Sequence, residues 1–259
     1  MENVFISTTQ GASDKYSLGA SSFIGDREEQ QDCACICANH SCLLAAVCDG
    51  MGGASGGKVA SSIAISSMMD CFKAGGTRHI EHPDTFLLGA ATKANKLVAQ
   101  GLNGAVGGTT IVTAMIQDGQ LYWFSAGDSR LYIYRTGELI QVTRDHNYLL
   151  RLNELKRLGK ISEEEYIKEK PIGEALISYL GLGNLELYDL ALNGVSIISG
   201  DVILLATDGL YKIVSDNELR RALSRVTSGA ESAKELIEEV KKRGINTGRD
   251  NATAIVIRA

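Results

Sequence analysis

Short apolar segments separated by turn residues dominate the chain, and their lengths and β-branched content predict strands. The pairs Asp118-Gly119 and Thr136-Gly137 lie between consecutive segments and are typical of hairpin turns. Consecutive hairpins predict antiparallel sheets rather than alternating parallel strands and helices. The predicted strands cover residues 33–38, 42–48, 110–116, 120–126, 130–134, 138–142, 202–206 and 252–257.

Helical periodicity is confined to separate blocks of the sequence, before, between and after the predicted hairpins. These blocks cover residues 57–72, 83–102, 147–168, 215–226 and 230–243. Ser215 is a candidate N-cap for the fourth block, because polar residues follow it before the first apolar position. Helices on both sides of the hairpins predict an α+β sandwich, in which helices pack on antiparallel sheets.

Composition and charge narrow the class of protein. The chain has 259 residues, 44% of them hydrophobic and 22% charged, which is typical of a globular domain with a large core. We therefore predict one domain over residues 1–259. The net charge of −5 disfavours binding to nucleic acid or to an anionic membrane. The chain has no apolar run of membrane-spanning length and no signal-peptide pattern, so we expect a cytoplasmic protein and, by default, a monomer.

Five of the six cysteines fall within residues 33–48, in apolar, strand-like sequence. Cys33, Cys35 and Cys37 alternate, so they would share one face of a strand. A metal or redox site would favour paired Cys-x-x-Cys motifs, which this sequence lacks. We favour the simpler interpretation that these cysteines are small buried hydrophobes in a reducing cytosol.

Aspartates recur at the ends of the predicted strands. Asp49, Asp128 and Asp208 each follow a strand, whereas Asp32 and Asp250 each precede one. In an antiparallel sheet the end of one strand lies beside the start of its neighbour. The five carboxylates could therefore meet along one rim of the fold.

Two hairpins make this expectation more specific. A turn centred on residues 40–41 would place Asp32 opposite Asp49, and directly opposed like charges destabilise a sheet. A bound cation is the simplest compensation. A two-residue turn at 118–119 would place Asp128 opposite Thr109.

Carboxylate, carbonyl and water ligands suit Mg²⁺ or Mn²⁺, and no cluster of His or Cys competes for a softer metal such as zinc. A carboxylate-rich site that holds two such ions about 3.5–4 Å apart suits hydrolysis of phosphate esters. Each Asp-Gly pair taken singly is also an ordinary turn. The hypothesis therefore depends on the whole set and its order.

Seven short motifs carry a more specific signal. They are Arg27-Glu28-Glu29-Gln30-Gln31-Asp32, Asp49-Gly50-Met51-Gly52-Gly53, Gly108-Thr109-Thr110, Gly127-Asp128-Ser129-Arg130, Thr143-Arg144-Asp145-His146, Thr207-Asp208-Gly209-Leu210 and Gly248-Arg249-Asp250-Asn251-Ala252-Thr253. This series resembles the metal-dependent protein serine/threonine phosphatases of the PPM (type 2C) family in their compact bacterial form, from about residue 16 to residue 259. The resemblance implies a four-layer α-β-β-α sandwich of two antiparallel sheets flanked by helices, with a metal site at one rim.

The resemblance also implies a set of metal ligands for two core ions, Mn²⁺ or Mg²⁺, and a weaker third. Asp49 would bridge the two core ions, and Asp208 and Asp250 would complete the shell of the first. The carbonyl of Gly50 would bind the second ion, and Asp32 would hold it through water. Asp128 would be a ligand of the third ion.

Other residues would act on the substrate or support the site. Arg27 would clamp the substrate phosphate, a role suited to its planar fork of donors, and with Asp49 would form the catalytic pair. Asn251 and Thr109 would support the site. Residues 145–180 would form a mobile flap beside the cleft, and His146 would order it.

The predicted reaction is hydrolysis of phosphoserine and phosphothreonine monoesters by a hydroxide that bridges the two metal ions. The substrates would be phosphoproteins, targets of a serine/threonine kinase. Two alternatives are a phosphoprotein-binding module on the same fold and a metal-dependent hydrolase of small phosphoesters or nucleotides. Several positions depart from the family pattern without removing a metal ligand, and they bear on substrate recognition and the flap. They are Gln30, Ala54, Lys58, Glu174 and Ser178.

Overall fold

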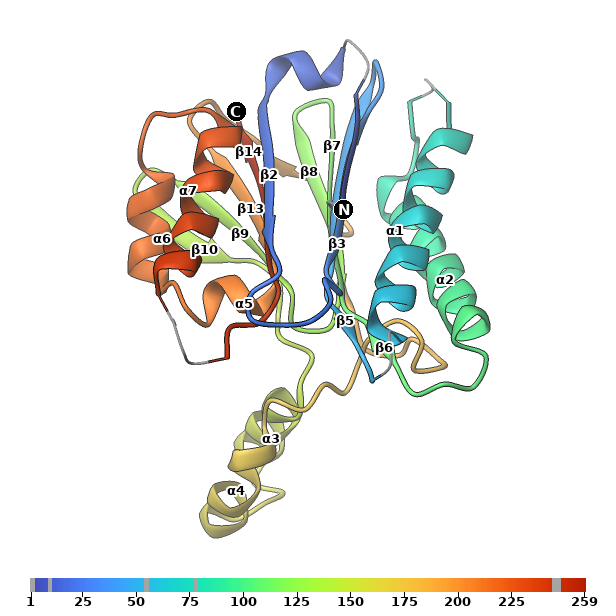
Figure 1. The fold of residues 1–259 in the computed structure, drawn as a ribbon, viewed down its shortest axis with the longest axis vertical. Coiled ribbons are helices and arrows are strands. Elements are labelled where there is room, and N and C mark those ends of the chain that lie inside the picture. Colours follow the sequence, from blue (N-terminus) through green and yellow to red (C-terminus); the bar gives the residue numbers. More distant parts are fainter. Residues whose placement is uncertain (1–2, 9–10, 54–55, 77–78, 244–247) are drawn as a thin grey trace.

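Two β-sheets lie face to face in this computed structural model, and helices cover their outer faces (Figure 1). The structure describes residues 3–8, 11–53, 56–76, 79–243 and 248–259. The first sheet contains, in spatial order, β1 (Val4–Thr8), β3 (Cys33–Ala38), β4 (Cys42–Cys48), β7 (Ile111–Gln117), β8 (Gln120–Ala126) and β11 (Asp189–Leu190), and β12 (Val195–Ser196) also pairs with β8. The second contains β10 (Glu138–Gln141), β9 (Arg130–Arg135), β13 (Val202–Ala206), β14 (Ala252–Arg258) and β2 (Ser17–Phe23). A short third sheet pairs β5 (Gly50–Met51) with β6 (Gly108–Thr109).

The helices form two outer layers and one projecting unit (Figure 1). The first sheet is covered by α1 (Gly56–Ala74) and α2 (Pro83–Leu102), and the second by α5 (Asp208–Tyr211), α6 (Asp216–Leu223) and α7 (Gly229–Lys242). The short helix η1 (Ala12–Lys15) precedes β2. The flap unit consists of α3 (Tyr148–Arg157), α4 (Glu163–Glu169) and η2 (Lys170–Ile172), and it projects from one end of the sandwich (Figure 1).

Three layers of buried apolar side chains hold the four structural layers together. Along β13, Ile203 and Leu205 face the other sheet, whereas Leu204 faces the helices α5 to α7. Along β3, Ile36 faces the other sheet, whereas Cys35 faces α1 and α2. These strands are apolar at every position because both of their faces are buried.

The sequence prediction of an α+β sandwich with a four-layer arrangement is confirmed. All eight predicted strands are present, and the alternating cysteines are buried free thiols as predicted. The strands β1 and β2 were not predicted, and β1 runs parallel to β3 at the edge of an otherwise antiparallel sheet. The predicted helix 147–168 is two helices, because Gly159 has a left-handed φ of +65° and Ser162 begins α4 with a capping box.

The predicted registers of the two hairpins, with turns at residues 40–41 and 118–119, are confirmed by the residue pairs of their strands. Cys33 pairs with Cys48, which puts Asp32 and Asp49 at the adjoining ends of β3 and β4. The turn at 118–119 also has the predicted two-residue form. The expectation that Thr109 lies opposite Asp128 is wrong, because Thr109 leaves the first sheet and pairs with Gly50 in the β5–β6 sheet.

Among the described residues, no helix is both long enough and apolar enough to cross a membrane.

Candidate metal centre

A cleft of about 980 Å³ opens at the rim where α5 and the β5–β6 sheet approach each other. Four of the predicted aspartates line it: Asp49, Asp128, Asp208 and Asp250. Arg27 lies at the same cleft, as does Gly50. The structure therefore brings together side chains that are separated by up to 223 residues in sequence, as the bond between Arg27 and Asp250 shows.

Asp49 is held in place through its backbone. Its N–H donates to the hydroxyl of Thr110 at 2.9 Å, and its carbonyl accepts from the backbone N–H of Thr110 and from the hydroxyl of Thr109, both at 2.9 Å. Burial raises the pKa of the Asp49 carboxyl well above its usual range, and repulsion from Asp32 and Asp208 adds to this. A carboxylate in this position needs a neighbouring cation to be stable in its charged form.

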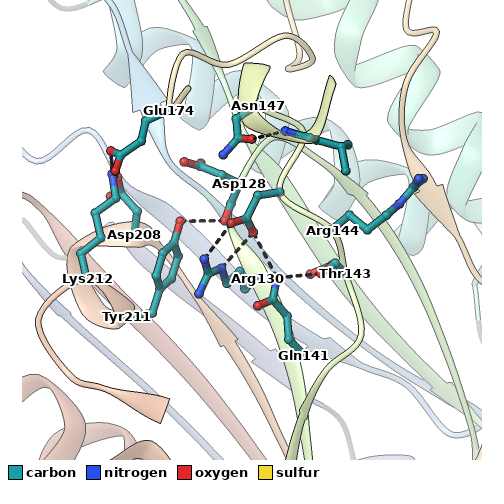
Figure 2. Close-up of polar contacts among 12 residues, drawn as sticks. Asp128, Arg130, Gln141, Thr143, Arg144, Asn147, Glu174, Asp208, Tyr211 and Lys212 are labelled. Atoms are coloured by element: carbon teal, nitrogen blue, oxygen red, sulfur yellow. Dashed lines mark hydrogen bonds and ion pairs between the residues drawn. The ribbon is translucent and has the colours of Figure 1, made fainter. Parts of the chain in front are cut away.

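Asp128 is 8% exposed and lies on the loop between β8 and β9. Burial raises its pKa to about 6, and the charge of Asp208 acts in the same direction. The hydroxyl of Tyr211 donates to the backbone carbonyl of Asp128 at 3.0 Å (Figure 2). The guanidinium of Arg130 stacks on the ring of Tyr211. The same guanidinium donates two hydrogen bonds to the carboxylate of Asp145, at 2.9 and 2.7 Å. The loop that carries Asp128 is therefore anchored both to α5 and to the start of the flap.

Asp208 is the first residue of α5, directly after the buried strand β13. Its Oδ2 lies 2.9 Å from Nζ of Lys212, one helical turn later. The same ammonium group lies 3.1 Å from Oε2 of Glu174 at the far end of the flap (Figure 2). Partial burial opposes the charge of Lys212, but Asp208 and Glu174 outweigh it and raise the pKa of the ammonium group.

Asp250 is paired with Arg27, whose Nη2 donates to Asp250 Oδ2 at 2.6 Å. The loop that carries Arg27 is held by the buried side chain of Asn251. Asn251 accepts from the N–H of Gln31 at 2.7 Å and donates to the carbonyls of Ile24 and Glu29 at 2.7 and 3.1 Å. Asn251 thus lines the cleft and joins the start of β14 to the loop that carries Arg27.

Asp32 lies behind the cleft rather than in its lining. It is fully buried, and its Oδ2 accepts from the hydroxyls of Thr207 and Thr253 at 2.9 and 2.7 Å. Its Oδ1 has no hydrogen-bond partner among the described residues. Burial raises the pKa of Asp32 to about 7, so its charged form also lacks compensation. Its neighbour Gln31 lines the cleft.

The donor set fits divalent cations that prefer oxygen ligands, although the side chains do not yet converge on one point. Within the described ranges, no three His, Cys, Asp or Glu side chains already form a metal cluster. Two of the carboxylates are instead engaged by cations of the protein, Asp250 by Arg27 and Asp208 by Lys212. Crowded carboxylates with raised pKa values, together with the unpartnered oxygen of Asp32, fit Mg²⁺ or Mn²⁺.

Comparison with known proteins identifies the family. A sequence model of the family described as protein phosphatase 2C matches residues 20–243, which is most of the chain. This chain belongs to the protein phosphatase 2C family. The resemblance inferred from the seven motifs is thereby confirmed.

Several members of the protein phosphatase 2C family are similar over most of their length. The chain is 32% identical to the serine/threonine phosphatase stp of Listeria welshimeri over 219 residues, which is 82% of each protein. The crystal structure of the Mycobacterium tuberculosis serine/threonine phosphatase PstP/Ppp superposes with a TM-score of 0.73 at 28% identity, covering 94% of this chain and 98% of that one. The catalytic domain of PstP in complex with two manganese ions has a TM-score of 0.73 at 29% identity, covering 94% and 97%.

His146 lies outside the cleft of this protein phosphatase 2C member, at the base of the flap. It is fully buried, and its Nδ1 accepts from the N–H of Gly127 at 3.2 Å. Its carbonyl accepts from the N–H of Ile177 at 3.0 Å, which joins the two ends of the flap. This placement is consistent with a role in ordering the flap.

The departures from the family pattern spare the predicted metal ligands, although one of them, Glu174, lines the cleft. Gln30 donates to Ser22 at 2.8 Å and accepts from the N–H of Asp32 at 3.1 Å. Lys58 is exposed, and the hydroxyl of Ser178 donates to the carbonyl of Leu187. Ala54 lies outside the described residues.

Sequence reasoning missed Lys212, which forms an ion pair with Asp208. A signal was available, because Lys212 follows Asp208 by four residues and would share its face of a helix. Because the four-residue helix α5 was not predicted, the spacing of Asp208 and Lys212 could not be interpreted as a contact between them.

Proposed function

We propose that this protein is a Mn²⁺- or Mg²⁺-dependent phosphatase that hydrolyses phosphoserine and phosphothreonine monoesters in proteins. The observation that carries the proposal is that four aspartates and Arg27 line the same cleft. The family membership and the named activity of the relatives support the same reaction.

We assign the two core ions to Asp49, Asp208 and Asp250, with the Gly50 carbonyl as a backbone ligand. Asp32 would act from behind the lining, through its unpartnered Oδ1 and an intervening water. When bound, two such ions supply positive charge for the phosphoryl oxygens and activate water as the nucleophile. The Mn²⁺ ions in the PstP catalytic domain support this assignment by analogy.

Arg27 is suited to bind the substrate phosphate. Its side chain is 58% exposed, so an entering phosphate can reach it from solvent. Nη2 bonds to Asp250, and the guanidinium fork has further N–H donors that match phosphate geometry. Asn251 holds the loop that carries Arg27, so it would orient the guanidinium toward the reacting group.

The cleft favours a phosphoprotein over a nucleotide substrate. The described residues that line it include no aromatic side chain on which a base could stack. The complete set of aspartates also disfavours a pure binding module, because such a module has no need for crowded carboxylates. We further infer that the substrates are products of a serine/threonine kinase and that the chain acts as a monomer in signalling.

The six cysteines support a cytoplasmic location. All of them are free thiols and five are buried in the core. Buried free thiols are typical of proteins that fold in a reducing compartment.

The experiment that tests the function is hydrolysis of a phosphothreonine peptide with Mn²⁺, with excess EDTA, and by the Asp208→Asn variant. The matched control is Asp118→Asn, the same change at an exposed turn whose left-handed φ of 52° suits Asn. We expect turnover by the unmodified protein and the control, and none with EDTA or Asp208→Asn. A faster rate on nucleotides than on the peptide would favour the small-phosphoester alternative. A folded protein that binds Mn²⁺ without turnover would favour the binding module.

A further inference from the structure

A lysine side chain lies at the acidic corner of the cleft where the family resemblance expects a third metal ion. Nζ of Lys212 is 2.9 Å from Asp208 Oδ2 and 3.1 Å from Glu174 Oε2. Figure 2 shows Asp128 beside this group, on the side of Tyr211 away from Lys212. Lys212 and Asp128 both line the cleft.

The position of Lys212 is fixed from two directions. It is the C-cap of α5, and its backbone N–H donates to the carbonyl of Asp208 at 2.9 Å, so the two side chains share one face of a single turn. Tyr211, its neighbour, is tied to the backbone of Asp128. Glu174 holds the ammonium group from the flap side. The ammonium group therefore lies between α5 and the flap, with a carboxylate on each side.

Lys212 supplies one positive charge to a corner of the cleft that holds three carboxylates, Asp128, Glu174 and Asp208. Asp208 and Asp128 repel each other, and the positive charge of Lys212 offsets this repulsion at both. A divalent ion held between Asp128 and Asp208 would lie close to the ammonium group, which is 2.9 Å from Asp208 Oδ2, and like charges at such distances repel. Lys212 engages only one oxygen of Asp208, which leaves the other oxygen for the core ions.

We propose that the ammonium group of Lys212 takes the place of the third, weaker metal ion, so that this chain binds two divalent ions instead of three. The proposal rests on the proposed function, because it assumes that the core site binds two ions. It replaces the expectation, implied by the family resemblance, that Asp128 is a ligand of a third ion. Lys212 instead pairs with Asp208 and Glu174 and so links α5 to the flap, and the loop of Asp128 is held by the bond from Tyr211 to its carbonyl.

The test counts bound Mn²⁺ rather than turnover. Protein stripped with EDTA is dialysed against MnCl₂ up to millimolar concentrations, and bound metal is measured by elemental analysis. Lys212→Met removes the charge at similar side-chain length, and Lys212→Arg keeps it. Lys156→Met is the matched control, because Lys156 pairs with the exposed Glu163 in the flap unit.

We expect two Mn²⁺ per chain for the unmodified protein, Lys212→Arg and Lys156→Met. We expect a third Mn²⁺ in Lys212→Met, with an affinity about tenfold or more above any third-site binding in the unmodified protein, because a repelling charge has gone. Three ions in the unmodified protein, or two in Lys212→Met, would overturn the role of Lys212 and leave the two-metal phosphatase intact. Absence of any Mn²⁺ binding would overturn the proposed function as well.

Discussion

Replacing Asn251 with alanine tests whether one buried amide organises the phosphate-binding side of the cleft. Asn251 is 4% exposed, and its side chain forms hydrogen bonds with the backbone of Gln31, Ile24 and Glu29. These three backbone groups belong to the loop that carries Arg27. The substitution should therefore loosen this loop without touching a predicted metal ligand.

The magnitude follows from the hydrogen bonds that are lost. Each contributes about 1 kcal/mol net, so three bonds correspond to about 3 kcal/mol. Ile24 is exposed and Gln31 is partly buried, so water can replace part of what is lost. We expect the free energy of unfolding to fall by about 2–3 kcal/mol. We also expect KM for a phosphopeptide to rise by roughly tenfold, because Arg27 loses its orientation.

Urea denaturation at fixed Mn²⁺ gives the stability, and steady-state kinetics on a phosphothreonine peptide give KM and kcat separately. Asn153→Ala is the control, because Asn153 is exposed and its side chain accepts one bond from Tyr166 in the flap unit. It should change the stability by less than about 0.5 kcal/mol. A similarly small change for Asn251→Ala, with KM unaltered, would refute the role of the amide.

Three further predictions concern the carboxylates and the packing around them. Without metal, the pKa of Asp128 is about 6 in the folded state, against about 3.9 in the unfolded state. The folded state therefore binds the Asp128 proton more tightly than the unfolded state does. The free energy of unfolding should fall as the pH rises from about 4 to 6. Urea denaturation in EDTA should show this loss of stability. In Asp128→Asn the pH-dependent loss should be smaller by up to about 3 kcal/mol, and a variant whose pH profile matches that of the unmodified protein would contradict the assignment. Gly209→Ala should destabilise the protein by about 1–3 kcal/mol in the same assay, because its Cβ would lie 2.0 Å from the carbonyl oxygen of Asn251, and a neutral result would show that α5 can shift. Arg130→Lys should lose the two-bond contact with Asp145 and increase protease cleavage of the flap unit, whereas equal cleavage rates would place the flap anchor elsewhere.

The fold was largely predictable because its strands are marked by local signals. The strands β3, β4, β8 and β13 begin and end as predicted, since turn residues bound each apolar run. The strand β2 was missed because its sequence is rich in Gly and Ser. The need for glycine at position 19 in this strand comes from a tertiary contact, since a Cβ there would lie 2.2 Å from the backbone of Gly229 in α7.

The acidic part of the site was predictable for the same reason, and its basic part was not. The strands next to Asp32 and Asp49 are antiparallel neighbours in one sheet, and those next to Asp208 and Asp250 are antiparallel neighbours in the other, so the order of the aspartates was informative within each pair. The contact of Lys212 with Glu174 depends on how the flap returns to the sandwich, across 38 residues. No local pattern encodes that path.

The origin of the acidic residues explains why the site can hold its geometry. Asp49 follows a strand of the first sheet, whereas Asp208 and Asp250 adjoin strands of the second. Their separation is therefore set by the packed layer between the sheets, in which Val47, Leu205 and Ile255 are fully buried. A close-packed layer of this kind resists compression and expansion, so carboxylates that repel one another stay near each other at a cost in stability. A divalent ion held by these carboxylates would reduce that repulsion, so we expect metal binding to increase the stability of the sandwich.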